Sequence, residues 1–279
     1  MWYNRIVDLG VMRMDIQLWR EILSPYVLAV DEIVVKFNHM INEYRDSGRY
    51  CPIEQVEGRV KKISSILEKA QKKGIPVGDV EERIVDIAGV RLICQFVEDI
   101  QTVVELIKER QDMKVVYEKD YITNSKDSGY RSYHVIIEYA VHTSKGPKKI
   151  KAEIQIRTLA MDFWATIEHS LQYKYKFNMP SQIRERLSKA ANAIIVLDEE
   201  MSAVRDEIMD AQNSFQLKAN LVSDILNNIQ NLYKKANKRE MVKIQDEFFK
   251  IYEKGDLYEL EKFHQELDII SESYRAQSL

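Results

Sequence analysis

The sequence has few of the residues that mark an extracellular or membrane protein. Only Cys51 and Cys94 occur among its 279 residues, too few for a disulfide framework or a four-cysteine zinc site. No run of about 18 apolar residues is present that could span a membrane. Asp8 and Asp15 interrupt the N-terminal segment where a secretory signal would need an apolar stretch. We therefore expect a cytoplasmic protein without a membrane partner.

The chain also lacks an excess of positive charge and several familiar catalytic motifs. It has 41 Lys and Arg against 44 Asp and Glu, whereas a protein that coats DNA would be strongly basic. No Gly-x4-Gly-Lys-Ser/Thr loop occurs, which excludes a P-loop enzyme. His134 and His169 have no neighbouring Cys or His at zinc-ligand spacing, so zinc is not expected. The 45% apolar and 30% charged residues are typical of a folded globular chain.

Glycine and proline are scarce, so the few present mark the ends of elements clearly. Apolar residues at steps of three and four predict a helix over residues 19–44, with a start at Ser24-Pro25. Further helices are expected over residues 60–73, which stop at Gly74, and over residues 99–110. The first part of the chain is therefore mainly helical.

The middle of the chain reads differently, as short apolar runs. Strands are predicted over 90–96, 114–117 and 133–141, and the turn at 144–147 forms a hairpin into a strand over 149–157. In that last strand, polar and apolar side chains alternate, so Glu153, Gln155 and Arg157 share one face. Strands mixed with helices indicate an α/β or α+β core.

After Pro180 the pattern is helical throughout. A heptad-like apolar seam runs through Leu187, Ala190, Ile194, Leu197, Met201, Val204, Ile208 and Ala211. Such a seam is expected to bury against another helix, in the same chain or in a partner. New helices are predicted to start near Asn237 and at Gly255-Asp256.

Two groups of residues suggest phosphate and metal chemistry. Arg59, Lys62, Ser65 and Lys69 share roughly one face of the predicted helix, which suits a polyphosphate but also suits an ordinary solvated surface. Asp86 opens the first strand, where a carboxylate suits a metal ligand or simply a turn.

Two further groups suggest a nucleotide cleft. Lys119, Lys126, Tyr130 and His134 place cations and an aromatic ring around a glycine-containing loop, as phosphates and a base require, although structural tyrosines would explain it equally well. If the polar face of the 149–157 strand lines a cleft, Glu153 would join Asp86 about a magnesium ion. The alternative is a solvent-facing strand.

Taken in order, these elements resemble the synthetase domain of the RelA/SpoT family, and above all its small alarmone synthetases. The resemblance covers residues 15–211 and rests on Gly58-Arg59, Ser65, Lys69, Asp86-Ile-Ala-Gly-Val-Arg91, Lys126, Gly129-Tyr130, His134, Glu153-Ile-Gln-Ile-Arg157 and Trp164 with Glu168-His169. It implies an α+β fold with a nucleotidyltransferase-like mixed sheet. It also divides the chain into an N-terminal helical region (1–57), the synthetase core (58–178), a C-terminal helix (179–213) and a helical extension (214–279).

The resemblance implies a reaction, in which the β,γ-pyrophosphate of ATP passes to the 3′-hydroxyl of GTP or GDP and AMP leaves. Asp86 and Glu153 would hold Mg²⁺, and Glu153 would accept the hydroxyl proton. The other implied contacts are to ATP by Arg59, Lys62, Ser65, Lys69 and Arg91, and to the acceptor by Lys119, Lys126, Tyr130, His134, Gln155 and Arg157. Arg59 and Arg91 would sandwich adenine and Tyr130 would stack on guanine.

Regulation and assembly are implied as well. Many members are homotetramers, and some bind the product in a central cleft through residues replaced here by Val34, Asn38, Gln55 and Asp162. We therefore expect allosteric activation to be weak or absent. No histidine is followed by Asp, so the family's hydrolase activity is not expected.

Two other functions stay open on the sequence. A related transferase could act on adenine nucleotides or the tRNA 3′ end, because stacking on Tyr130 does not itself select guanine. A non-catalytic RNA-binding module is less compatible with the presence of both Asp86 and Glu153, and RNA binding is kept only as a secondary property.

Overall fold

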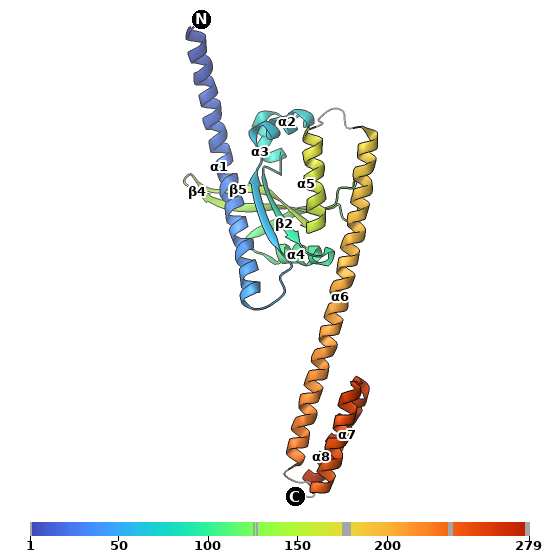
Figure 1. Cartoon of the computed structure of the whole chain (residues 1–279). Helices are drawn as coiled ribbons and strands as arrows, with labels where there is room; N and C mark the ends of the chain where they lie inside the picture. The colour runs from blue at the N-terminus through green and yellow to red at the C-terminus, as the bar shows by residue number, and fades with distance from the viewer. Residues whose placement is uncertain (1, 125, 127, 175–179, 234–236, 277–279) are drawn as a thin grey trace. The chain divides into compact units, whose positions relative to one another are not determined.

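The computed structural model describes residues 2–124, 126, 128–174, 180–233 and 237–276 (Figure 1). The chain divides into two compact units, residues 1–202 and 203–279, which are described separately below. Among the described residues, no helix combines the length and the apolar character needed to cross a bilayer.

The first unit is built on one five-stranded sheet of order β1-β2-β5-β4-β3. Only the β2–β5 pair is parallel, and the other neighbours are antiparallel. The strands are β1 (Gln55–Val60), β2 (Ala88–Cys94), β3 (Met113–Asp120), β4 (Tyr133–Thr143) and β5 (Gly146–Thr158). The mixed sheet with flanking helices confirms the predicted α+β class, including the β4–β5 hairpin.

Helices flank this sheet (Figure 1). In chain order they are α1 (Trp2–Asp46), α2 (Ile63–Lys73), the 3-10 turn η1 (Val77–Asp79), α3 (Val80–Arg83), α4 (Val97–Glu109), α5 (Leu159–Lys174) and α6 (Ser181–Leu232). Ile33 and Phe37 of α1 are fully buried in the same core as Val135 and Ile154 of the sheet. A Cβ at Gly58 would lie 2.6 Å from methyl groups of Val30 and Val34, so glycine lets β1 lie directly against α1.

Two predicted helix starts differ most from the structure, and the strands predicted over 90–96, 114–117, 133–141 and 149–157 are found at 88–94, 113–120, 133–143 and 146–158. The helix predicted over 60–73 begins only at Ile63, because residues 55–60 form the edge strand β1, paired with β2. The side chains of β1 are mostly exposed, so this strand carries little of the apolar pattern that identifies a strand. Helix α1 runs through Pro25 instead of starting there. Proline removes one backbone donor, and Tyr26, Ala29 and Ile33 that follow it are buried against the core.

The seam predicted on α6 is only partly buried in the described residues, where Leu187 and Ile194 pack against the core of the first unit. Leu197, Met201, Val204 and Ile208 are 45 to 52% exposed. In the first unit, α6 instead buries Ala191, Asp198 and Ser202. The Asp198 carboxylate accepts a hydrogen bond from Thr158 at 3.0 Å, and Ser202 donates to Glu98 at 3.0 Å. Apolar packing and these hydrogen bonds together attach the start of this helix to the first unit, and burial of the exposed part of the seam in a partner stays a prediction.

The second unit has its own apolar core. It consists of the end of α6 with α7 (Lys238–Lys254) and α8 (Leu257–Ala276), which bury Ile225, Ile244, Phe248, Leu260 and Leu267, among others. The helix starts predicted at Asn237 and Asp256 are confirmed. The Asn237 side chain accepts from the backbone N–H of Glu240, and Asp256 accepts from that of Tyr258.

Candidate active site

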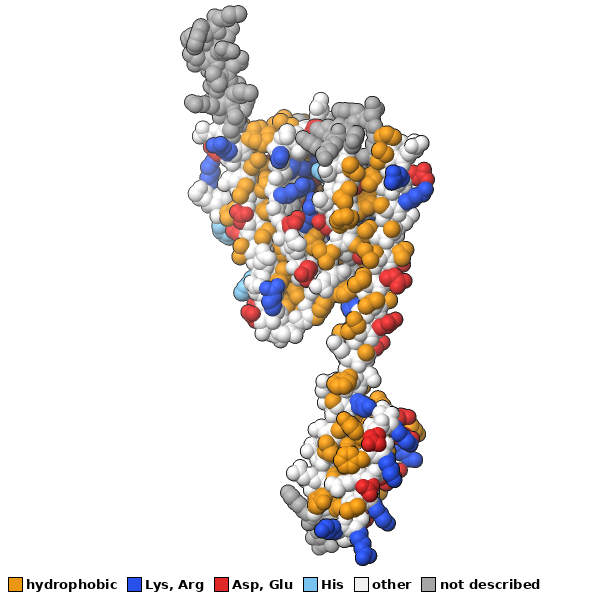
Figure 2. All heavy atoms as spheres, in the orientation of Figure 1, with side chains coloured by type: hydrophobic (Ala, Val, Ile, Leu, Met, Phe, Trp, Pro, Cys, Tyr) orange, Lys and Arg blue, Asp and Glu red, His pale blue; other side chains and the backbone are white. Residues whose placement is uncertain are grey.

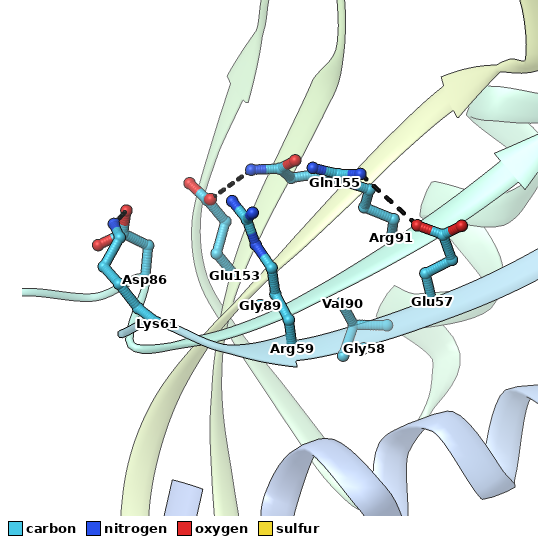
Figure 3. Close-up of a pocket in the computed structure, with 10 residues that line it drawn as sticks. All are labelled: Glu57, Gly58, Arg59, Lys61, Asp86, Gly89, Val90, Arg91, Glu153 and Gln155. Carbon is cyan, nitrogen blue, oxygen red and sulfur yellow. Dashed lines mark hydrogen bonds and ion pairs between the residues drawn. The ribbon is translucent and has the colours of Figure 1, made fainter. Parts of the chain in front are cut away.

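A cavity opens on the polar face of β5 and extends over β2 and β1, the next two strands of the sheet (Figure 3). Figure 2 shows basic and acidic side chains gathered in the middle of this face of the unit. The cavity is lined by Glu57, Gly58, Arg59, Lys61, Asp86, Gly89, Val90, Arg91, Glu153 and Gln155. The period-two alternation of β5 explains the arrangement: Ala152, Ile154 and Ile156 face the core, and the polar residues between them face the cavity.

Asp86 is held by two lysines but keeps one free oxygen. Lys61 and Lys69 both donate to Oδ2, Lys69 at 2.6 Å. Burial disfavours the charged form, yet the two ammonium groups outweigh it and lower the pKa of Asp86. Oδ1 is buried and has no hydrogen-bond partner in the described part of the chain. Such an orphaned carboxylate oxygen fits a hard divalent cation, which prefers oxygen ligands.

Glu153 is oriented from two sides. His134 Nδ1 donates to one carboxylate oxygen at 3.0 Å, and the Gln155 amide donates to the other at 2.7 Å. Burial raises the pKa of Glu153, but these hydrogen bonds outweigh it, so the net direction is downward. The pKa of Glu153 also responds to the charge of Asp86, which lines the same cavity. The two carboxylates predicted to act together therefore share one site, and both are ionised at neutral pH.

Two carboxylates alone do not make a complete metal cage. The described residues contain no group of three or more His, Cys, Asp or Glu side chains placed to hold a metal. A magnesium ion characteristically binds through one or two carboxylates and completes its shell with water and substrate phosphates. The donor set here matches that mode of binding and not a structural metal site.

A larger cavity of about 530 Å³ adjoins the first. It is lined by Arg59, Arg91, Lys126, Ser128, Tyr130, Gln155, Arg157, Ala165, Thr166, Glu168, His169 and Gln172. Arg59, Arg91 and Gln155 line both cavities and so form their common wall. Burial and the charge of Arg157 both lower the pKa of Arg91, which shows how closely the guanidinium groups gather.

Arg157 is the hub of the polar network in the larger cavity. It is 4% exposed and donates to the Tyr130 hydroxyl and the Gln155 carbonyl, each at 2.7 Å. It also donates to Asp162 at 3.1 Å, and the same Asp162 oxygen lies 3.8 Å from Arg91. The Tyr130 hydroxyl lies 2.8 Å from His134 Nε2, which closes the path to Glu153. A single hydrogen-bonded network therefore joins Tyr130 to the proposed base.

The ring of Tyr130 is already in contact with cations. The Lys126 ammonium lies 4.6 Å from the ring centroid and 4.5 Å from that of Tyr121. The Arg157 guanidinium lies 5.2 Å from the Tyr130 ring. These contacts hold the ring at the cavity wall by cation–π attraction.

Most of the predicted site residues line one of the two cavities, and two others contact residues that line them. Lys69 and His134 lie behind Asp86 and Glu153 and bond to them. Lys62, Ser65 and Lys119 line neither cavity. Their predicted substrate contacts stay predictions.

Lys61 was missed by the sequence analysis and lines the smaller cavity. In a helix, Lys62 would share the face of Arg59, but residues 55–60 are a strand. Lys61 follows this strand directly, and its N–H donates to the Ile87 carbonyl at 2.8 Å, so the backbone stays extended there and residues two apart share a face. Arg59 and Lys61 therefore both reach the cavity. Recognising β1 as a strand would have identified Lys61.

Comparison with known proteins leads to the same family that the motifs resemble. A family model described as the region found in RelA/SpoT proteins matches residues 58–178. GTP pyrophosphokinase YjbM of Bacillus subtilis is 50% identical over 205 residues, which cover 74% of this chain and 97% of that protein. A GTP pyrophosphokinase family protein from Streptococcus pneumoniae superposes with a TM-score of 0.67 at 52% identity, covering 70% of this chain and 96% of the other.

The same similarity extends to a liganded structure. Small alarmone synthetase 1 from Bacillus subtilis, bound to its product pppGpp, superposes with a TM-score of 0.67 at 50% identity and covers 69% of this chain and 98% of that chain. The resemblance read from the motifs is confirmed. This chain therefore belongs to the RelA/SpoT family.

Proposed function

We propose that this protein is a GTP pyrophosphokinase, which transfers the β,γ-pyrophosphate of ATP to the 3′-hydroxyl of GTP or GDP and releases AMP. The observation that carries the proposal is the placement of Asp86 and Glu153 in one cavity that shares a wall with a second, tyrosine-lined cavity. Two adjoining cavities fit a donor and an acceptor nucleotide. The names and the bound product of its relatives support the same reaction.

Asp86 and Glu153 would hold magnesium, with the substrate phosphates as further ligands. The ion, when bound, neutralises charge on the transferred phosphates. Because Lys61 and Lys69 bond to Asp86 in the structure, a phosphate chain offers these two ammonium groups an alternative anion. The carboxylate is then left to the metal.

The remaining roles follow the two cavities. Arg59 and Arg91 would contact adenine on the donor side, with Lys62, Ser65 and Lys69 toward its phosphates. On the acceptor side, Tyr130 would stack on the base, and Gln155 and Arg157 would orient the network around it. Lys119, Lys126 and His134 would attract the 5′-phosphates. Glu153 would remove the 3′-hydroxyl proton, aided by the hydrogen bonds that keep it ionised.

The direct test incubates the purified protein with magnesium, ATP and one acceptor at a time, and identifies products by chromatography. A guanosine nucleotide with two phosphates on the 3′-oxygen, formed together with AMP, is the expected outcome. Product from ATP, ADP or the tRNA 3′ end in place of GTP or GDP would favour the related transferase. No product from any acceptor would contradict catalysis by this site.

Tyr130→Ala is expected to raise the KM for GTP much more than the KM for ATP. A base stacked on an aromatic ring gains about 1–3 kcal/mol, which corresponds to roughly a 5- to 150-fold change in affinity. Tyr130→Phe keeps the ring and removes the hydroxyl that bonds His134 and Arg157, so it separates stacking from the network. Tyr258→Ala, on a 74% exposed tyrosine of the second unit, is the matched control. Equal effects on both KM values would remove the stacking role.

Adding guanosine pentaphosphate is expected to leave the initial rate unchanged. Val34, at one of the positions used for product binding in some relatives, packs a methyl group toward Gly58, and Asp162 is engaged by Arg157. An acid and an apolar side chain would repel or ignore a polyphosphate where cations and a ring would bind it. The measurement is the rate of AMP release against pentaphosphate concentration. A rate that climbs several-fold would refute this expectation.

We further infer a synthetase without hydrolase activity, in line with the absence of any His-Asp pair from the sequence. A homo-oligomer, with the tetramer of many family members as its expected form, would cover the exposed seam of α6. A cytoplasmic location completes this proposal.

A further inference from the structure

One buried acid in the larger cavity has no role in the reaction described above. Glu168 of α5 is 9% exposed and lines the cavity together with Tyr130 and Lys126. One of its oxygens accepts a hydrogen bond from Gln172. Burial raises the pKa of Glu168, and the charge of Lys126 opposes this only in part. A carboxyl group removed from water in this way is a site for further hydrogen-bond donors.

Gly129 brings this acid to the same place as the tyrosine. Its φ of +85° is open to glycine, and a Cβ there would lie 2.4 Å from the Ala191 Cβ and 3.7 Å from the Trp164 ring. The loop therefore lies directly on α5 and α6. Trp164 is fixed in turn by its indole N–H, which donates to the Leu187 carbonyl at 3.0 Å. Tyr130 follows this glycine, so its ring and the Glu168 carboxyl border one space.

Glu168 differs in charge from the rest of that space. Among the described residues that line the larger cavity it is the only acid, whereas Arg59, Arg91, Lys126 and Arg157 are cations. The cations suit phosphates and the acceptor atoms of a base. Only Glu168 offers the cavity an anionic group that accepts hydrogen bonds without donating any.

A stacked purine presents its edge to the walls of such a cavity. The Watson–Crick edge of guanine carries two adjacent donors, N1–H and the 2-amino group, which match the two oxygens of a carboxylate. Adenine presents only one donor at that edge, its 6-amino group, and the neighbouring N1 lone pair would face the second carboxylate oxygen and repel it. Stacking tolerates any base, so selection must come from hydrogen bonds at the edge. We propose that Glu168 reads the Watson–Crick edge of the acceptor base and makes it guanine. This proposal rests on the proposed transferase function.

Glu168→Gln tests the proposal through acceptor selectivity. Inosine triphosphate keeps N1–H and lacks the 2-amino group, so kcat/KM for GTP is compared with that for inosine triphosphate at saturating ATP. A bidentate base contact discriminates by about 1–3 kcal/mol, so the wild-type protein is expected to prefer GTP by roughly 5- to 150-fold. In Glu168→Gln this preference is expected to contract toward one, while the KM for ATP as donor stays unchanged.

The outcomes separate this proposal from a structural role and from the proposed function. A merely structural glutamate would lower the activity with both acceptors by the same factor and leave the preference intact, which would overturn the proposal. Equal use of GTP and inosine triphosphate by the wild-type protein would overturn it without any variant. Failure of the wild-type protein to form product from any acceptor would instead contradict the transferase function.

The control keeps the chemical change and moves it out of the cavity. Glu185→Gln alters an α6 glutamate whose side chain is 66% exposed and pairs with Lys189. It is expected to leave both the rate and the acceptor preference unchanged. If Glu168→Gln does not fold, Glu168→Asp retains the acid but withdraws it from the base, and the GTP preference should again contract.

Discussion

Glu153→Gln is expected to lower the rate of pyrophosphate transfer by about 10³-fold while the protein stays folded, because general-base catalysis contributes about 10²–10⁴-fold. Glutamine has the shape of glutamate but cannot take a proton from the 3′-hydroxyl. Its amide would also replace one carboxylate oxygen by an NH2 group, so one of His134 and Gln155, which both donate to the carboxylate in the structure, would face a donor in place of an acceptor. The rate is measured as AMP release with saturating ATP and GTP.

Folding and charge are controlled by a matched variant on the adjacent strand. Glu138 of β4 pairs with Lys149 at 2.9 Å and lies outside both cavities. Glu138→Gln makes the same chemical change and should leave the rate intact. The circular dichroism spectrum of Glu153→Gln should match that of the wild-type protein. A folded Glu153→Gln variant with near wild-type activity would place the base elsewhere.

Asp86→Asn is expected to have an effect of similar size, with a different signature. Loss of one metal-binding carboxylate removes charge stabilisation worth several kcal/mol, and about 4 kcal/mol corresponds to roughly 10³-fold in rate. The same change leaves Lys61 and Lys69 without their shared anion. These two cations are then free to bind phosphate, so ATP measured without magnesium should bind as tightly as before or more tightly. Transfer is lost while metal-free donor binding is kept.

Asp112 provides the control for removing a doubly paired aspartate. Its carboxylate bonds to Lys36 and Arg110, each at 2.8 Å. Asp112 lies outside both cavities and far from Asp86 in the sequence. Asp112→Asn should retain activity even where it lowers the melting temperature. Calorimetric titration of Asp86→Asn with ATP in the presence of a chelator gives the binding comparison. Weakened metal-free ATP binding would mean that Asp86 acts by orienting the lysines instead of by holding metal.

The alternation along β5 made the acidic and polar wall of the site predictable. A period of two depends only on local geometry, so Glu153, Gln155 and Arg157 could be placed together before the structure was known. The same holds for α7, whose start at Asn237 and end before Gly255 are set by side-chain capping and a left-handed glycine. Local rules settle such features.

Features that depend on partners distant in sequence were not predictable in this way. β1 is a strand because it pairs with β2, more than twenty residues later in the chain, and its own sequence carries little apolar alternation. That one missed pairing also left Lys61, which directly follows β1 and lines the smaller cavity, without an assigned role. Cross-strand register also decides the place of His134, which lies beside Gln155 and reaches Glu153. Spacing along the chain gives no measure of such neighbours.

The lysine held between two tyrosines has a consequence for acceptor affinity. Lys126 Nζ rests near the rings of Tyr121 and Tyr130, so a purine arriving there takes over a surface that the protein itself already covers. An ammonium on an aromatic face is stabilised by about 0.5–2 kcal/mol, and this attraction is lost when the base stacks on the ring. The phosphates of a 5′-phosphorylated acceptor compensate for this loss, because they pair with the Lys126 ammonium. A nucleoside without phosphates cannot do so, and should bind far more weakly than its stacking alone would suggest.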